Sequence, residues 1–280
     1  MIKIDYSDGI RITTENLEGI FKKEQLPLKV QIKNVVSKKI VWEINLNSGM
    51  WASYPSNEIN DVVINDAQGN FVYRYYWNVI EHGSIFYKSL WLYCKSLINA
   101  GKKPKGLVVG THDGEFGEWV PVIKNYMSEV LLVEGSEEQF NKLKENYSSL
   151  TDVKILKDII TPDGNDVEFF EGGKGYTNTV VKRVIDYWEK EEIFSTKRTS
   201  TSISELIKNK LGKVDWIHLD VEGLDAKLIM SLEEDLIPPF IIYEDFNLIE
   251  EEKNQLLEWF KKRGFIIHSE NGIGMAKKTI

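Results

Sequence analysis

The segment Gly106–Gly117 (GLVVGTHDGEFG) limits the possible folds of this 280-residue chain more than any other part of it. Its apolar run, Leu107–Val109, predicts a buried strand, and glycines follow at positions 110, 114 and 117 before a helical pattern begins. Glycine is needed where a chain turns sharply off a strand and must let a ligand approach its backbone. The segment therefore predicts a strand, a glycine turn and a helix.

A second apolar run, Val130–Val133, follows at the spacing of the next strand and ends in Glu134. An acid at the tip of the second strand is where nucleotide-type ligands present their ribose hydroxyls. The series strand, glycine turn, helix, strand and acid thus predicts half of a binding site for a nucleoside cofactor. An ordinary turn between a strand and a helix is the alternative.

The charge balance of the chain is acidic, with 35 Lys and Arg against 43 Asp and Glu, a formal charge of −8. Nucleic-acid and anionic-membrane partners usually meet a basic surface, so this balance argues against both. Cys94 is the single cysteine, which leaves no disulfide framework and no cysteine-based metal site. No apolar stretch is long enough for a membrane span, and the N-terminus (MIKIDYSDGI) lacks a secretory signal, so we expect a cytoplasmic protein.

Residues 1–100 are predicted to form a β-rich domain that ends in a connecting helix. Alternating and β-branched patterns indicate its strands, and DAQGN between two of them indicates a hairpin turn. The segment Asn99–Lys105 contains glycine and proline, and it separates this domain from the second one, 101–280. The expected elements are strands at 28–32, 39–44, 61–65 and 71–77, the last two forming the hairpin, and a helix at 84–99.

Beyond residue 105, strands and helices alternate, which predicts an α/β fold with a parallel sheet. The last two strands are joined only by Glu270–Gly272, too short for a crossover helix, so they must form an antiparallel hairpin. Ser136 is the expected N-cap of the helix after the second strand. The expected strands are 106–110, 130–134, 153–157, 167–171, 214–220, 240–245, 265–269 and 273–278, and the expected helices are 116–127, 137–147, 223–233 and 249–263.

Residues 172–204 form the least regular part of this half, with one helix expected at 178–192. The segment should lie over the face where the cofactor binds. A lid or substrate-binding role and a simple surface insertion both fit this pattern.

The segment Val214–Ile229 (VDWIHLDVEGLDAKLI) carries the most specific pattern of the chain. It resembles the strand and acidic turn of the FkbM family of S-adenosylmethionine-dependent methyltransferases, in which Asp-Val-Glu-Gly is followed by an acid two residues on. VVGTHDGEFG resembles the first motif of that family and LLVEGSEEQFNKLKENY the second, and the order and spacing of all three fit. The resemblance covers residues 104–280, and the matching residues of the third motif are Asp220, Val221, Glu222, Gly223 and Asp225.

The resemblance implies a Rossmann-like class I methyltransferase fold, with a parallel sheet and a closing antiparallel hairpin, after the N-terminal β-rich region. Three positions depart from the family pattern. Val108 stands where members often have an acid, His112 where they often have Asn, and His218 where they usually have a basic residue. These departures concern how the methionine part of the cofactor is held.

S-adenosylmethionine is the cofactor that the resemblance implies, bound at the carboxyl ends of the strands. Glu134 is expected to take both ribose hydroxyls, and the backbone amides after Gly110 to approach the methionine part. Asp158 is a candidate for the adenine amine, and His112 is either a ligand contact or a plain turn residue. The predicted cofactor-binding residues are Gly110, Thr111, His112, Asp113, Gly114, Glu134, Gly135, Ser136, Asp158 and Ile159.

Asp220, Glu222 and His218 are the candidate catalytic residues. A hydroxyl nucleophile needs a proton acceptor, or a metal that lowers its pKa. Asp220 ends a strand beside the expected sulfonium, and its alternative role is to cap the helix that starts near Gly223. His218 shares a strand face with Asp220, either as a poised base or as a buried, hydrogen-bonded histidine.

Asp220, Asp245 and Asn247 form an oxygen-rich set at two neighbouring strand ends, of the kind that binds divalent cations. Acids at strand ends are nevertheless common in this fold. We therefore predict no metal, with these three residues as the site if one is bound.

We predict an S-adenosylmethionine-dependent O-methyltransferase that acts on a hydroxyl of a sugar, a glycan or a related small molecule, since the resemblance implies a sugar or polyketide-like acceptor. Nine aromatic residues at 71–93 could stack on sugars or pack between the two domains. The alternatives are a non-catalytic binding module with the same fold and an N-methyltransferase for another substrate class. The sequence leaves an oligomer open.

Overall fold

The computed structural model describes residues 2–5, 10–14, 23–34, 39–48, 50–54, 60–69, 71–76, 85–115, 117–124, 127–172, 177–189 and 193–278. The chain divides into two compact units, Met1–Lys88 and Ser89–Ile280, and each is described by itself. Helix α1 (Ile85–Asn99) begins in the first unit and lies mostly in the second. The domain limits expected from the sequence, 1–100 and 101–280, remain a prediction.

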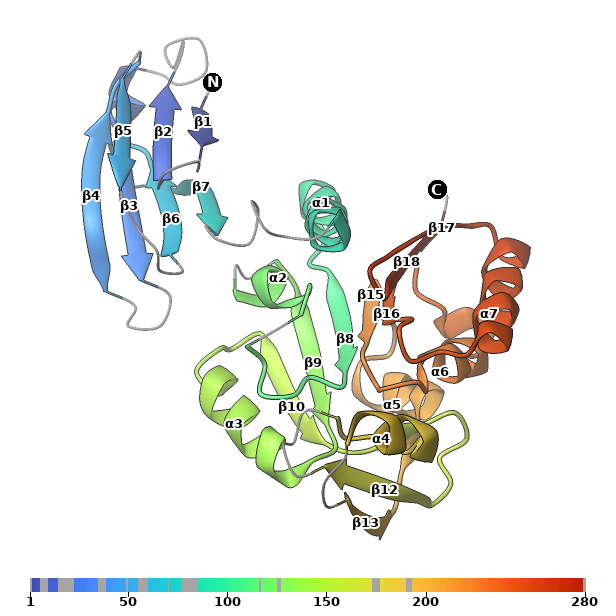
Figure 1. Cartoon of the computed structure of the whole chain (residues 1–280). Helices are drawn as coiled ribbons and strands as arrows, with labels where there is room; N and C mark the ends of the chain where they lie inside the picture. The colour runs from blue at the N-terminus through green and yellow to red at the C-terminus, as the bar shows by residue number, and fades with distance from the viewer. Residues whose placement is uncertain are drawn as a thin grey trace. The chain divides into compact units, whose positions relative to one another are not determined.

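The first unit contains two antiparallel sheets (Figure 1). One has the order β1 (Ile2–Asp5), β2 (Ile10–Thr14), β5 (Trp51–Tyr54), and the other the order β4 (Ile40–Leu46), β3 (Leu28–Asn34), β6 (Asn60–Asn65), β7 (Phe71–Tyr76); a short 3-10 helix spans Lys23–Gln25. The strands expected at 28–32 and 39–44 and the hairpin around DAQGN are confirmed as β3, β4 and the β6–β7 pair. Trp77 and residue 84, which end the expected hairpin and start the expected helix, lie outside the described residues.

The second unit is built on a seven-stranded sheet in which every strand but β18 runs in the same direction (Figure 1). The order is β10 (Val153–Lys157), β9 (Glu129–Glu134), β8 (Lys105–Val109), β15 (Trp216–Leu219), β16 (Phe240–Glu244), β18 (Ile273–Lys278), β17 (Phe265–Glu270). β18 is antiparallel to both of its neighbours, and Asn271 and Gly272 turn with positive φ between β17 and β18. The expected parallel sheet with a closing hairpin is confirmed.

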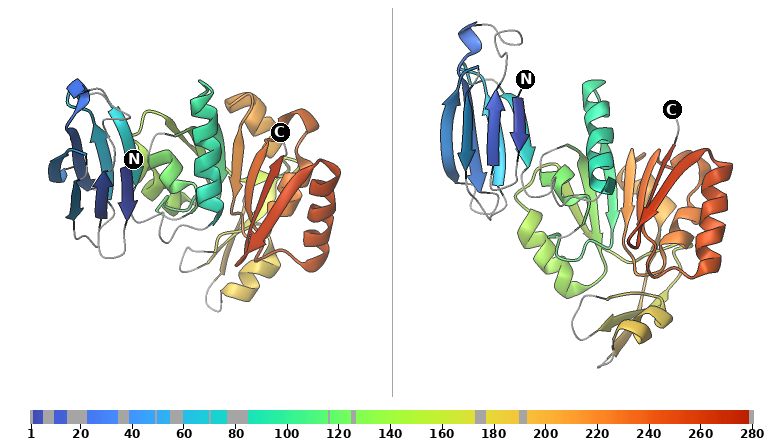
Figure 2. Two further views of the ribbon diagram at one scale, coloured as in Figure 1. Left: turned by 90° about the horizontal axis from the view of Figure 1, so that it is seen from above. Right: turned by 45° about the horizontal axis from the view of Figure 1, so that its top comes forward.

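Helices cover both faces of this sheet (Figure 2). On one face lie α1, α2 (Val120–Lys124) and α3 (Glu137–Tyr147), and Tyr93 of α1 stacks on Phe240 of β16 with ring centroids 5.1 Å apart. On the other lie α5 (Ile203–Lys210), α6 (Asp225–Ser231) and α7 (Glu250–Lys262). Alternate strand residues bury their side chains with these helices in one apolar core, which includes Leu107, Leu206, Ile217, Ile229, Ile241 and Phe260. Among the described residues, no helix has both the length and the apolar character needed to cross a membrane.

Residues 160–210 differ most from the sequence expectation. The strand expected at 167–171 in the parallel sheet is β12 (Val167–Gly172), which instead pairs antiparallel with β13 (Ile193–Arg198) in a separate sheet. That prediction was wrong because an apolar run does not reveal the partner of a strand. β11 (Ile160–Thr161) and β14 (Thr201–Ser202), which pair in parallel, were not expected either.

Three helices also depart from expectation. The helices expected at 116–127 and 178–192 are shorter, as α2 and α4 (Lys182–Trp188), and residues 116, 125–126 and 190–192 lie outside the described part. α5 was not expected, although Ser202 and Glu205 have the spacing of a helix start. The Ser202 hydroxyl accepts a hydrogen bond from the Glu205 N–H, which is the contact that this spacing allows. A 3-10 turn, Glu234–Leu236, follows α6.

Candidate active site

A cavity of about 250 Å³ lies at the carboxyl ends of the central strands of the seven-stranded sheet. The chain leaves β8 toward β9 on one side, while β15 pairs with β8 on the other. Connections that diverge in this way leave a crevice at the strand ends. The cavity is lined by Val109, Gly110, His112, Val133, Glu134, Gly135, Asp158, Ile159, Ile160, Phe169, Asn178, Thr179, Val180, Asp220, Val221, Glu222 and Leu224.

Gly110 brings the turn after β8 against the turn after β15. Its φ is 78°, and a Cβ there would lie 1.7 Å from the carbonyl oxygen of Asp220, so only glycine fits. The Asp220 N–H donates to the Val109 carbonyl at 3.0 Å. His112 follows with a φ of 49°, and its side chain lines the cavity. The two motifs that are far apart in the sequence therefore meet here at backbone distance.

Glu134 is buried at the end of β9 and held by the backbone on both of its oxygens. Oε1 accepts the Ser136 N–H and Oε2 the His112 N–H, each at 2.8 Å. Burial raises the pKa of Glu134 to about 7, although these hydrogen bonds lower it. Each carboxylate oxygen keeps a lone pair for a hydroxyl from the cavity. The geometry fits the ribose contact expected from the sequence.

Four of the predicted cofactor residues, Thr111, Asp113, Gly114 and Ser136, do not line the cavity. The Thr111 hydroxyl donates to the Val133 carbonyl at 3.3 Å, and Asp113 Oδ1 accepts the backbone N–H two residues on. Gly114 has a φ of 79°, and a Cβ there would lie 2.4 Å from the ring of Tyr147, whose hydroxyl donates to the Gly114 carbonyl. These residues shape and pack the turn, and direct binding by them remains a prediction. Ser136 is the N-cap of α3 by position, without a side-chain cap bond.

Asp158 and Ile159 lie beside the cavity where the chain leaves β10. Asp158 Oδ1 accepts the Ile159 N–H at 2.8 Å, and Oδ2 accepts the Thr201 hydroxyl at 2.7 Å. Gly135 leaves room for Ile159, since a Cβ at Gly135 would lie 3.1 Å from the Ile159 side chain. An apolar surface next to a fixed carboxylate suits a flat base with an exocyclic amine, and this contact remains a prediction.

Three acids, Asp220, Glu222 and Glu244, gather where β15 and β16 end. Asp220 is surrounded by protein on most sides, but it lines the cavity and is exposed there. Burial raises the pKa of all three acids, to about 8 for Glu222 and about 7 for Glu244, and the charge of Asp220 raises both values further. Asp220 and Glu222 line the cavity, so a cation bound there would favour their charged forms.

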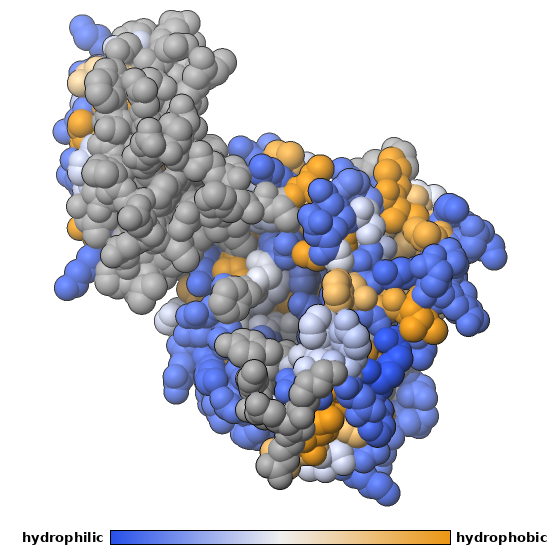
Figure 3. Space-filling view, viewed as in Figure 1, coloured by the Kyte–Doolittle hydropathy of each residue, from blue (hydrophilic) through white to orange (hydrophobic). Residues whose placement is uncertain are grey.

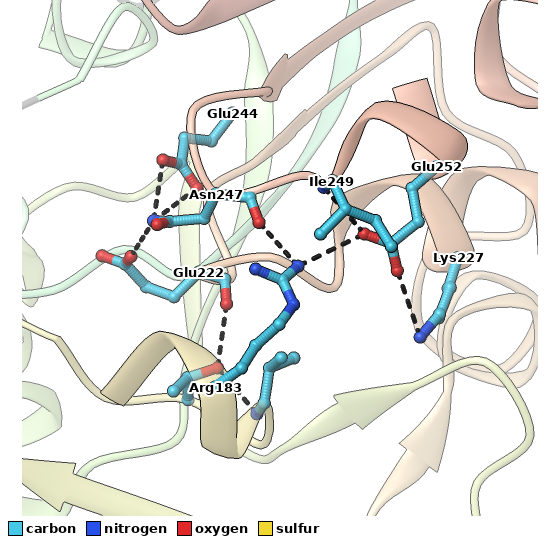
Figure 4. A network of polar contacts seen from close by, with 9 residues as sticks. Arg183, Glu222, Lys227, Glu244, Asn247, Ile249 and Glu252 are labelled. Carbon is cyan, nitrogen blue, oxygen red and sulfur yellow. Dashed lines mark hydrogen bonds and ion pairs between the residues drawn. The ribbon is translucent and has the colours of Figure 1, made fainter. Parts of the chain in front are cut away.

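Asn247 connects these acids to α4 (Figure 4). Its Nδ2 donates to Glu222 Oε2 at 2.7 Å and to Glu244 Oε1 at 3.0 Å, and its Oδ1 accepts the indole N–H of Trp188 at 2.9 Å. Arg183 donates to the Asn247 backbone carbonyl at 2.7 Å. One buried amide thus supplies donors to two acids that repel each other, and its orientation follows from these partners.

The structure does not assemble the three residues expected to hold a metal if one is bound. Asn247 presents its nitrogen rather than its oxygen to the acids, and its oxygen is taken by Trp188. The Asp245 carboxylate accepts a hydrogen bond from Ser269 on β17. Among the residues that the structure describes, no group of three or more His, Cys, Asp or Glu is arranged to hold a metal ion.

His218 is buried on β15, two residues before Asp220, and does not line the cavity. Its Nε2 lies 3.8 Å from a carboxylate oxygen of Glu118, and within the described part of the chain its Nδ1 has no hydrogen-bond partner. A charged His218 lowers the pKa of Asp220, whereas Glu118 raises it. Any influence of His218 on the reaction would therefore pass through Asp220, and its catalytic role remains a prediction.

The remaining residues of the third motif fix the turn between β15 and α6. α6 begins at Asp225 after Leu224, without a side-chain cap, so the alternative in which Asp220 caps this helix is wrong. Asp225 is buried, and its Oδ1 accepts the Glu244 N–H at 3.2 Å. Gly223 has a φ of 91°, and a Cβ there would lie 3.2 Å from the Asn247 carbonyl oxygen. The motif therefore ties the ends of β15 and β16 together.

The sequence did not single out the cavity residues between β12 and α4. Asn178, Thr179 and Val180 line the cavity, as does Phe169 of β12, and the Thr179 hydroxyl donates to the Glu222 carbonyl at 2.9 Å. Residues 178–180 of the segment expected to lie over the site therefore line the cavity, and its role as a lid or in substrate binding remains a prediction. The sequence pattern assigned these four residues to elements but gave no sign that they line a cavity, because that depends on the pairing of β12 with β13 in a separate sheet.

Comparison with known proteins identifies the family. A family model described as a methyltransferase FkbM domain matches residues 109–267, more than half of the chain. The chain belongs to the FkbM methyltransferase family. It is a methyltransferase with the class I fold, and S-adenosylmethionine is its cofactor. No curated protein matches the sequence significantly.

Several solved structures of methyltransferases are similar to this FkbM protein at low identity. The fibrillarin pre-rRNA processing protein of Methanococcus jannaschii is 15% identical, with a TM-score of 0.44 over 99% of this chain and 96% of that one. An O-methyltransferase from Bacillus cereus, in complex with SAH, is 14% identical, with a TM-score of 0.39 over 68% of this chain and 81% of that one. Similarity at this level does not identify the substrate of this protein.

The residues of the cavity fit S-adenosylmethionine on physical grounds. The ribose diol matches the two oxygens of Glu134, which are held in place by backbone N–H groups. The sulfonium is a cation, and the acids Asp220 and Glu222 in the cavity wall favour positive charge. Gly110 lets the ligand approach the backbone between the two motifs.

Proposed function

We propose that this methyltransferase transfers a methyl group to a hydroxyl of a saccharide. The observation that carries the proposal is the placement of Glu222 between the cofactor cavity and Asn247. Asp220 adjoins the Gly110 turn, whereas Glu222 is bonded to the loop after β16 and, through Asn247, to α4. Glu222 therefore lies on the side of the cavity away from the Gly110 turn. A proton acceptor there suits a hydroxyl nucleophile, which must lose its proton as it is methylated.

S-adenosylmethionine supplies a methyl group on a positively charged sulfur that is a good leaving group. The O–CH₃ bond forms as the S–CH₃ bond breaks, the bonding electrons stay on sulfur, and the hydroxyl proton passes to a carboxylate. We assign that carboxylate to Glu222, and to Asp220 the role of stabilising the positive charge and aligning the acceptor. His218 is assigned as a neighbour that tunes Asp220.

The charge of the bound cofactor makes Glu222 a competent base. Burial and Asp220 raise the pKa of Glu222 to about 8, so Glu222 is largely protonated at neutral pH in the free protein. A cation in the cavity favours the ionised carboxylate and lowers this pKa. Glu222 is therefore poised to accept a proton only when the methyl donor is present.

The cofactor contacts follow the order of the strands. We assign the ribose hydroxyls to Glu134, the adenine amine to Asp158 with Ile159 against the base, and the methionine part to the turn from Gly110 to His112. These assignments agree with the placement of each residue on the cavity wall.

The test is a transfer assay with methyl-labelled S-adenosylmethionine and the full chain, using neutral sugars and glycosides, phenols, peptides and RNA as acceptors. We expect label on saccharide oxygen, as an ether that resists alkali. Transfer to nitrogen, or to phenols, peptides or RNA with no transfer to saccharides, would overturn the proposal.

A further inference from the structure

Tyr187, Trp188 and Phe246 form an exposed cluster, which we call the aromatic platform. The rings of Trp188 and Phe246 lie 5.6 Å apart at 35°, and Tyr187 meets Trp188 edge-on at 5.0 Å. The three residues are 64%, 43% and 57% exposed in the order Tyr187, Trp188, Phe246. On the face shown in Figure 3, hydrophobic residues of the described surface form small groups within hydrophilic surroundings. Three aromatic rings exposed together form a surface on which the ring of a ligand can stack.

The platform is fixed in position relative to the candidate base. The indole N–H of Trp188 is bonded to Asn247, which is bonded in turn to Glu222 in the cavity wall. Phe246 packs on the turn between β17 and β18, where a Cβ at Gly272 would lie 3.0 Å from it. Two hydrogen bonds thus separate the ring of Trp188 from the carboxylate of Glu222. These contacts place the platform near Glu222, although none of its three residues lines the cavity itself.

The polar groups near the platform include two carboxylates, and the cations Arg183 and Lys227 beside them are both paired with Glu252. Glu222 and Glu244 are carboxylates, and Arg183 is already paired with Glu252 and the Asn247 carbonyl (Figure 4). A sugar ring has C–H faces that pack on aromatic rings and hydroxyls that donate to carboxylates. A nucleotide-linked sugar carries a diphosphate, which these acids repel once the bound methyl donor favours their ionised forms.

We infer that the aromatic platform is the acceptor subsite, and that it takes a neutral saccharide ring in preference to a nucleotide-linked sugar. This inference rests on the proposed function and makes it more specific. The sugar stacks on Trp188 and Phe246, and the hydroxyl to be methylated lies toward Glu222. Trp188 is thus a specificity-determining residue supplied by α4, and Asn247 is a positioning residue.

The experiment compares the wild-type full chain with Trp188→Ala, Phe246→Ala and Trp188→Phe. The matched control is Phe194→Ala, since Phe194 on β13 is 53% exposed and lies outside the platform. The probes are methyl glycosides of glucose, galactose, mannose and rhamnose, together with UDP-glucose and UDP-galactose. The readouts are KM and kcat for each acceptor and the Kd of S-adenosylhomocysteine by calorimetry.

We expect at least one neutral glycoside to be methylated and the UDP-sugars to be poor acceptors. Trp188→Ala should raise the KM of the glycoside roughly tenfold, the range of one aromatic stacking contact, and leave the Kd of S-adenosylhomocysteine unchanged. Phe246→Ala should act in the same direction, and Phe194→Ala should match wild type. Trp188→Phe keeps a ring for stacking, so its KM should be close to that of wild type. It loses the N–H that holds Asn247, so its kcat should be lower than that of wild type.

Two results overturn the inference while the proposed function stands. One is glycoside methylation with the same KM in Trp188→Ala, Phe246→Ala and Phe194→Ala. The other is a lower KM for UDP-sugars than for neutral glycosides. Transfer to a non-saccharide acceptor alone would instead defeat the proposed function, and the inference with it.

Discussion

The cavity has two sides that are built in different ways. On the cofactor side, Glu134 and Asp158 each accept a backbone N–H from one or two residues further on, and each has one more partner from a distant segment, the His112 N–H and the Thr201 hydroxyl. On the acceptor side, Glu222 is held by Asn247, which comes from the loop after β16 and is itself bonded to α4. Local contacts along the chain therefore contribute to the cofactor side, whereas the side chain of Glu222 on the acceptor side is held by a distant segment.

The two sides also differ in their electrostatics. Glu134 is a single buried carboxylate that several N–H groups stabilise in its charged form. Glu222 and Glu244 each have a pKa raised by burial and by the charge of Asp220. The first side is preorganised for a neutral diol, whereas the second holds acids close together and favours a cation. Substitutions on the two sides should therefore change different measured quantities.

Asp220→Asn should produce the largest effect and separates the two sides most strongly. The side chain keeps its shape and loses its charge, so kcat should fall by about 10²–10⁴-fold while the Kd of S-adenosylhomocysteine changes little. Steady-state kinetics and calorimetry on the same preparation check this. Wild-type turnover in Asp220→Asn would remove the acceptor-side role of Asp220.

Glu134→Ala should show the opposite pattern. It removes the hydrogen bonds to the ribose and should weaken S-adenosylmethionine binding by about 1.5–3 kcal/mol, the range for hydrogen bonds to a charged group. Glu137→Ala, at an exposed acid three residues away in the first turn of α3, is the control and should bind like wild type. Unchanged affinity in Glu134→Ala would refute the ribose assignment.

The pH dependence of binding distinguishes the cofactor side from the acceptor side when two ligands are compared, one with a sulfonium and one without. Ribose hydroxyls donate to ionised Glu134, whose pKa is about 7, so both S-adenosylmethionine and S-adenosylhomocysteine should bind more weakly as pH falls below 7. Only the sulfonium senses Glu222 and Glu244, with pKa values of about 8 and 7. The affinity for S-adenosylmethionine, divided by that for S-adenosylhomocysteine, should therefore rise roughly tenfold from pH 6 to pH 9. A constant ratio would show that the sulfonium lies away from these acids.

Glu222→Gln tests the acceptor side without any ligand, through its effect on the stability of the folded protein. A pKa raised from about 4.5 to about 8 in the folded state means that folding loses stability as pH rises through this range. Glu222→Gln should thus raise the free energy of unfolding by about 1–3 kcal/mol at pH 8 and hardly change it at pH 4.5. Denaturation at both values, with exposed Glu258→Gln as control, checks the sign. A destabilising effect at pH 8 would mean that the Asn247 bonds outweigh the repulsion.

The sequence predicted the cofactor side better than the acceptor side for a physical reason. Gly110 and Glu134 act within a few residues of a strand end, so strand pattern and spacing locate them. Trp188 and Asn247 meet only because α4 folds onto the loop after β16, and no local pattern encodes that contact. Asn247 entered the sequence analysis as a metal ligand, whereas the structure turns its nitrogen toward the acids.

The sheet shows the same limit. Apolar runs located the seven strands of the main sheet, and the short link between β17 and β18 required a hairpin. The run that became β12 looks like the others, but its partner is β13, in the segment without clear periodicity. Patterns along the chain predict elements, whereas pairing depends on contacts that the patterns do not contain.

A crystal structure with S-adenosylhomocysteine would show which side of the cavity holds which part of the cofactor. We expect the ribose hydroxyls on Glu134, the sulfur beside Asp220, and open space from the sulfur toward Glu222 and Trp188. A ligand whose ribose lies away from Glu134, or whose sulfur points away from Asp220 and Glu222, would contradict the division of the cavity into a cofactor side and an acceptor side.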